Sequence, residues 1–155
     1  MILEGLIENS LSGEIDTRIR EQDIDGYKIT MSRATVNEGE IVNEETPDFI
    51  GVIALASGFR RNSNFSLPTI DVNMAISIVT RKECDPTAQK HEQLVETISN
   101  MLSSWHKWPN QVSVLDNAKF KVGELFMNGG SGRTDNNGAW CDTINFYLRG
   151  SEIFE

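Results

Sequence analysis

The residues of this chain best suited to chemistry are two histidines and two cysteines, and their spacing forms no ligand pattern. His91 lies on the apolar stripe of an expected helix, as a core or edge residue would, and His106 lies between two tryptophans near the end of that helix. Neither HExxH nor a Cys/His pair with zinc spacing occurs, so we expect no zinc site. Cys84 and Cys141 are expected to be reduced thiols of a cytoplasmic protein. Because catalytic partners meet in space, a Cys–His dyad stays open at this stage.

Acidic residues are abundant, but they are not arranged as a metal-binding motif. Asp135 and Asp142 flank a turn rich in Asn and Gly, where Asp is common for backbone reasons. A divalent cation between them is an alternative that the sequence leaves open, although the EF-hand pattern is absent. The glycine-rich run 129–134 lacks the GxxxxGK[ST] spacing and precedes an apolar strand, so we expect a hairpin loop there and not a phosphate site. The sequence therefore predicts no catalytic residue, no metal ligand and no cofactor.

The composition indicates one acidic domain. A chain of 155 residues fits a single domain spanning 1–155. Its 23 acids against 14 bases give a net charge of -9, which makes it a poor candidate for tight binding to duplex DNA. Acids occupy the N-terminus where a secretory signal carries bases, and no apolar run is long enough to cross a bilayer. We expect a protein made in the cytoplasm, without a membrane partner. The three tryptophans are better suited to packing and interfaces than to base stacking, because no positive groove accompanies them.

Hydrophobic periodicity predicts an α+β fold. A helical stripe with a four-residue period occupies the first 20 residues, with Gly13 as a candidate kink. Alternating or continuous apolar runs predict strands at 27–31, 49–56, 70–80 and 140–150. Val112 and Val114, followed by Phe120 and Val122, suggest one or two further strands, one of them over 120–127. An amphipathic helix is predicted over 87–105, with Asp85 as N-cap and Pro86 at the first helical position. We expect a mainly antiparallel sheet of four to five strands, with the N-terminal helix and the central amphipathic helix packed on one face.

Three segments are expected to be loops. Residues 37–48 are acidic and contain Gly39 and Pro47. Residues 57–68 (SGFRRNSNFSLP) are rich in Ser, Asn, Gly and Pro, and they are expected to protrude as an arm between two strands. Residues 128–138 are expected to form a flexible turn. Long loops in a compact domain often carry function, so the arm is the first candidate for partner contacts.

The strand 71–80, its connector and the helix 87–105 resemble one family. The connector, from Arg81 to Pro86, has an R-x-x-x-D-P form, and the helix follows it directly. This arrangement is similar to that of the tail terminator (tail-completion) proteins of long-tailed bacteriophages, which also have an N-terminal helix and two closing strands. The acidic segment 37–48 and the arm 57–68 depart from the family pattern.

The resemblance implies a structural protein of the virion tail or neck, with neither enzymatic activity nor a cofactor. Such a protein forms a homo-oligomeric ring, expected to be a hexamer, which caps the tail tube and joins it to the head connector. DNA passes through the lumen without specific binding. Its partners would be further copies of itself, the tail tube protein and the neck protein. The residues expected at subunit or partner contacts are Phe59, Arg60, Arg61, Phe65 and Arg133. The residues expected to face the lumen are Glu38, Glu40, Glu44 and Glu45.

Two other functions remain as alternatives. The chain could instead be another tail-tube, neck or contractile-injection component on a related scaffold, which would form stacked tubes and not closed rings. It could also be a small enzyme or ligand-binding domain, which would require a polar pocket containing titratable groups with perturbed pKa values.

Overall fold

Two helices and a five-stranded sheet make up the described part of the chain. The computed structural model describes residues 3–31, 48–60, 69–106 and 112–153. The elements in chain order are α1 (Leu3–Glu21), β1 (Lys28–Met31), β2 (Phe49–Arg60), β3 (Thr69–Arg81), α2 (Gln89–His106), the 3-10 helix η1 (Val112–Leu115), β4 (Phe120–Asn136) and β5 (Ala139–Glu152). The predicted α+β class and the positions of both helices are confirmed.

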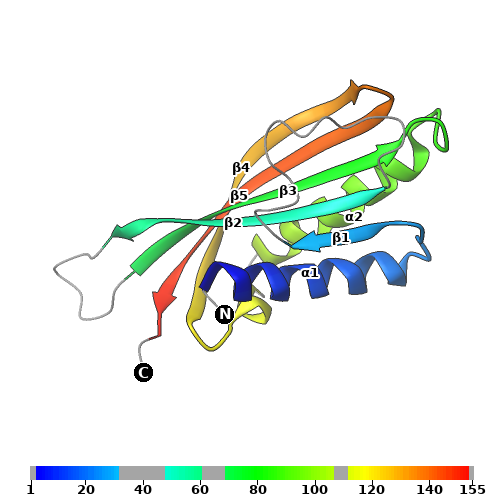
Figure 1. The fold of residues 1–155 in the computed structure, drawn as a ribbon. Helices are drawn as coiled ribbons and strands as arrows, with labels where there is room; N and C mark the ends of the chain where they lie inside the picture. Colours follow the sequence, from blue (N-terminus) through cyan, green and yellow to red (C-terminus); the bar gives the residue numbers. More distant parts are fainter. Residues whose placement is uncertain (1–2, 32–47, 61–68, 107–111, 154–155) are drawn as a thin grey trace.

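The strands form one mixed sheet in the order β1-β2-β3-β5-β4. Every neighbouring pair is antiparallel except β1 and β2, which run parallel. Both helices lie on one face of this sheet, with α1 along the β1–β2 side and α2 across β3, β4 and β5 (Figure 1). A short hairpin turn cannot join two parallel strands, because the chain has to return to the end at which the first strand began. Residues 32–47 lie between β1 and β2 in the sequence.

The core lies between the helices and the sheet. The stripe predicted for the first helix is buried from Leu3 to Ile19. Gly13 does not interrupt α1, which runs unbroken to Glu21. On α2 the largest buried side chain is Trp105, and it lies with Phe120 and Phe146 among the residues fully buried in the core. Alternate residues of β5 from Asp142 to Gly150 are buried, which is the period-2 pattern of a strand covered on one face.

Three element boundaries differ from the sequence prediction. Val112 and Val114 suggested a strand but belong to η1. Strand β4 continues through the glycine-rich segment to Asn136, so only the tight turn at Asn137 and Gly138, both with positive φ, is a loop. Strand β2 extends to Arg60 and therefore includes the first four residues of the predicted arm. The acidic segment 37–48 lies outside the described residues except for Asp48.

The start of α2 also differs in detail from the prediction. Asp85 supplies a capping side chain, because its carboxylate accepts from the backbone N–H groups of Lys90 at 3.3 Å and His91 at 3.0 Å. The N-cap position itself is Ala88, whose carbonyl oxygen accepts the first helical hydrogen bond from Glu92, so the predicted position was wrong by three residues. Pro86, however, lies in a turn before the helix, and Ala88 adopts a left-handed φ of 57°. The helix begins only at Gln89.

Tyr27 ties the segment after α1 back to that helix. Its hydroxyl donates a hydrogen bond to Asp16 Oδ1 at 3.0 Å, and Arg20 pairs with the same carboxylate. Burial, the hydrogen bond to Asp16 and the charge of that carboxylate, in decreasing order of effect, together raise the pKa of the Tyr27 phenol to about 12.

We therefore expect one of the two tyrosines to ionise near pH 12 when phenolate absorbance is followed in the folded protein. The pKa of Tyr27 is higher in the folded state than the ordinary tyrosine value of 10.0, so the stability it contributes is present below pH 10 and is lost as the pH rises toward 12. Replacing Asp16 with Asn removes the carboxylate charge but leaves the burial of the phenol, which is the largest cause of the shift. The pKa of Tyr27 should therefore fall part of the way toward 10. An unchanged titration in this variant would contradict the assignment of Asp16.

Candidate functional site

A buried polar cluster joins α2 to the sheet, and its members are Thr80, His91 and Asp142. His91 Nδ1 lies 2.9 Å from Thr80 Oγ1, and His91 Nε2 lies 3.3 Å from Asp142 Oδ2. The three residue types are those of a nucleophile, a base and an orienting acid. Thr80 and His91, however, have 0% of their surface exposed. A hydroxyl in that position cannot meet a substrate, so this cluster anchors the helix and satisfies its own polar groups.

Neither ring nitrogen of His91 is available for a cysteine, because each faces another side chain. His106 Nδ1 lies 2.8 Å from the carbonyl oxygen of Leu125. Burial raises the pKa of the Cys141 thiol, and the charges of Asp135 and Asp142 raise it further. Within the described ranges, the structure therefore offers no Cys–His dyad with an activated thiol.

Asp135 and Asp142, the candidate ligands for a divalent cation, have different partners. Asp135 pairs with Lys82 at 2.6 Å, and this contact holds the pKa of the Asp135 carboxyl below its ordinary value. Asp142 faces His91 instead. Among the residues that the structure describes, no three His, Cys, Asp or Glu side chains are grouped so that they could hold a metal ion.

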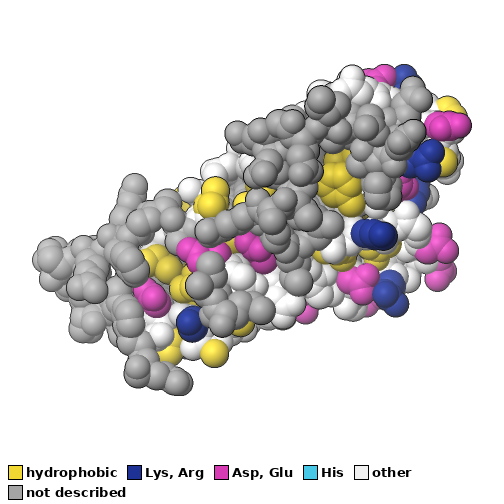
Figure 2. Space-filling view, in the orientation of Figure 1, with side chains coloured by type: hydrophobic (Ala, Val, Ile, Leu, Met, Phe, Trp, Pro, Cys, Tyr) yellow, Lys and Arg dark blue, Asp and Glu magenta, His cyan; other side chains and the backbone are white. Residues whose placement is uncertain are grey.

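Trp140 is the centre of an exposed cluster at the turn end of the β4–β5 hairpin. Its indole N–H donates to the Asp85 carbonyl oxygen at 2.8 Å. Lys82 Nζ and Arg133 Cζ each lie 4.9 Å from the centre of its ring, within the range of cation–π contacts. Arg133 also pairs with Glu92 of α2 at 2.7 Å. On the described part of the face in Figure 2, basic and acidic side chains stand next to one another at this end of the molecule.

The predicted contact residues fall in three different places. Arg133 is an exposed residue of β4, in a strand and not in the predicted loop. Phe59 and Arg60 lie at the far end of β2, paired with Ile70 and Thr69 of β3. Arg61, Phe65 and the four glutamates expected at the lumen (Glu38, Glu40, Glu44 and Glu45) lie outside the described residues.

The face of the sheet opposite the helices carries an aromatic row that sequence reasoning missed. Strand pairing places Leu55, Asn73, Tyr147 and Phe126 side by side across β2, β3, β5 and β4. The rings of Phe126 and Tyr147 stack with centres 4.7 Å apart, and Leu55 is 52% exposed. Next to the rings, Arg149 pairs with Asp71 at 2.9 Å, which raises the pKa of the guanidinium. The alternation within each strand predicts which residues share a face. It does not predict the register between strands, which places these four residues in one row.

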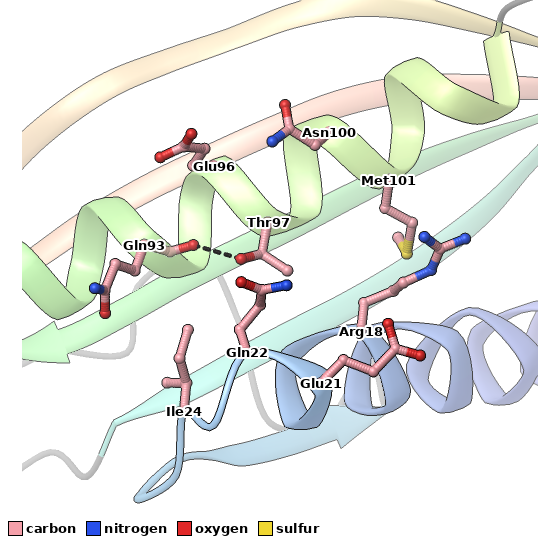
Figure 3. Close-up of a pocket in the computed structure, with 9 residues that line it drawn as sticks. All are labelled: Arg18, Glu21, Gln22, Ile24, Gln93, Glu96, Thr97, Asn100 and Met101. Carbon is pink, nitrogen blue, oxygen red and sulfur yellow. Dashed lines mark hydrogen bonds between the residues drawn. The ribbon is translucent and has the colours of Figure 1, made fainter.

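A groove runs between the end of α1 and the outer surface of α2, and we call it the interhelical groove. Its volume is about 410 Å³, and nine residues of the two helices and the turn after α1 line it (Figure 3). Arg18 extends from α1 toward Met101, and Gln22 extends toward Thr97 (Figure 3). The lining is mostly polar: one guanidinium, two carboxylates, three amides and one hydroxyl surround Ile24 and Met101. This volume lies within the range of ligand pockets.

Comparison with known proteins gives the fold and no family. No protein-family model matches the chain, and neither does any curated protein. Among solved structures, the chain is similar to a chain from the virion of a native gene transfer agent (GTA) particle. The two share a TM-score of 0.54 and 11% sequence identity, and the match covers 91% of this chain and 94% of the other. At this identity the likeness establishes a common fold. No helix in the described ranges is long and apolar enough to span a membrane.

Proposed function

We propose that this protein is a structural subunit of a virion or virion-like particle. The observation that carries the proposal is the extent of the shared fold, which takes in nearly the whole of both this chain and a chain of the GTA virion. A fold shared from end to end favours a shared structural role over a fold reused for a different site, although folds alone do not fix function.

Within the particle, we propose that the protein is a tail terminator, a ring that caps the tail tube and joins it to the head connector. Support comes from β3, the connector with Asp85 and Pro86, and α2, which occur in the order and packing that the sequence resemblance implies. The net charge of -9 suits a ring through which DNA slides without adhering. No enzymatic role is proposed, because the one triad-like arrangement in the described chain has a nucleophile candidate, Thr80, without exposed surface.

The proposal predicts that the purified protein assembles into closed rings. Size-exclusion chromatography with light scattering is expected to give a mass six times that of the chain, and negative-stain electron microscopy is expected to show single rings with a central hole. Long stacked tubes would instead favour a tail-tube or neck component. A protein that stays monomeric at every concentration tested, both alone and with purified tail tubes, would contradict the ring.

A further inference from the structure

The interhelical groove contains polar groups that the described structure leaves without partners. Glu21 of α1 and Glu96 on the α2 rim line the groove, and neither makes an ion pair within the described ranges. The groove therefore carries two carboxylates and one guanidinium, and the partly buried Ile24 supplies its apolar surface, since Met101 is buried beneath. An occupant with cationic and apolar side chains fits this lining, because the cations meet the carboxylates and an apolar group meets Ile24.

One segment of the chain has that character. Residues 57–68 contain two arginines and two phenylalanines and no acid, in a chain whose net charge is -9. Arg60 and Arg61 can pair with the groove carboxylates. A phenylalanine ring can pack against Ile24 and beneath the guanidinium of Arg18, which extends across the groove toward α2 in Figure 3.

The segment cannot fill the groove of its own chain. Strand β2 ends at Arg60 and β3 begins at Thr69, so the point of attachment of residues 61–68 is the far end of β2. The groove adjoins the end of α1, close to β1, whose Lys28 pairs with the first residue of β2. The two sites lie at opposite ends of the molecule (Figure 1). The 12 residues of β2 span roughly 40 Å. The eight residues between Arg60 and Thr69 reach out and back by only about 15 Å.

We propose that the interhelical groove binds residues 57–68 of a neighbouring copy of this chain. The contact joins one end of a subunit to the other end of the next, so it is heterologous, and such contacts close into rings when the rotation between subunits allows. The inference rests on the proposed ring and specifies the contact that builds it.

Charge reversal on either side tests the contact. Glu21→Arg with Glu96→Arg, and separately Arg60→Glu with Arg61→Glu, are each expected to weaken self-association by about tenfold or more, measured by light scattering over a concentration series. The matched control is Glu14→Arg with Glu83→Arg, which makes the same charge change outside the groove and should assemble as the unmodified protein does. Mixing the two reversed variants should restore rings, because each groove then meets an arm of opposite charge.

The outcomes separate this inference from the proposed function. An unmodified protein that forms no ring, either alone or with purified tail tubes, overturns both. Rings that survive reversal of the groove charges, or a mixture that fails to reassemble, overturn the groove contact and leave the ring standing. A second measurement needs no destabilising change: a photo-crosslinking amino acid in place of Phe65 should attach to residues 18–24 or 93–101 of a second, isotopically labelled copy. Adducts confined to other segments overturn the inference.

Discussion

Replacing His91 with alanine is expected to lower the free energy of unfolding by about 3–5 kcal/mol. The imidazole has 0% of its surface exposed, and both of its nitrogens face buried polar partners. Its removal leaves the Thr80 hydroxyl and the Asp142 carboxylate without that partner in a site that water does not reach freely. A cavity the size of the ring adds to the loss. The effect should be large although Thr80, the partner of His91, lies eleven residues along β3 from Thr69, the residue paired with Arg60.

Urea unfolding followed by tryptophan fluorescence measures this loss. The matched control is His106→Ala, the other histidine of α2, which is exposed and has one hydrogen bond to the Leu125 carbonyl oxygen. This control should cost about 1 kcal/mol or less. His91→Ala and His106→Ala variants of equal stability would show that the buried cluster contributes nothing specific.

The parts of the fold that local sequence pattern determines were predicted well. The stripe on α2, including His91, and the alternation on β3 both follow from side-chain periodicity, which the chain displays directly. The capping role of the Asp85 side chain was also predictable, because capping requires only a suitable side chain before a helical pattern. The polar partners of His91 could not be predicted from the sequence, because Thr80 and Asp142 lie 11 and 51 residues away along the chain.

The wrong predictions concern segments whose state depends on distant partners. The apolar residues Val112 and Val114 suggested a strand, but they belong to the 3-10 helix η1. Conversely, the glycine-rich part of β4 has weak strand propensity, and β5 supplies the ladder that makes it a strand. The parallel pairing of β1 with β2 was equally invisible, because periodicity is identical in parallel and antiparallel strands.

The candidate binding surfaces also divide into those that the sequence predicts and those that depend on contacts between distant segments. Arg133 and the arm were identifiable from composition, whereas the interhelical groove joins two helices separated in sequence by residues 22–88. The aromatic row depends on the register of four strands. The sequence can indicate which residues have side chains suited to an interface. It cannot predict the interhelical groove, because the groove exists only where α1 and α2 pack together in the fold.

Gly150→Ala is expected to be the second severely destabilising change, with a loss of about 3 kcal/mol or more. A Cβ atom at this position would lie 2.2 Å from the Lys121 carbonyl oxygen and 2.8 Å from Phe120 Cζ. Phe120 has 0% of its surface exposed, so its ring has no free space to enter. The carbonyl belongs to the backbone of β4, paired with β5 at this point, and it can move only if the ladder moves with it. Two strands and the end of the core must therefore shift to admit one methyl group.

Gly132→Ala separates this steric cost from the general effect of removing a glycine. Both substitutions restrict the unfolded chain in the same way, which stabilises a compatible fold by about 0.4–1 kcal/mol. A Cβ atom at Gly132, also in β4, would meet nothing within 4 Å. We therefore expect Gly132→Ala to be neutral or slightly stabilising in thermal unfolding and Gly150→Ala to lower the midpoint strongly. Equal midpoints would mean that β4 and β5 separate at little cost near Gly150. Because β4 is an edge strand, the same freedom would leave it open to pairing with another chain.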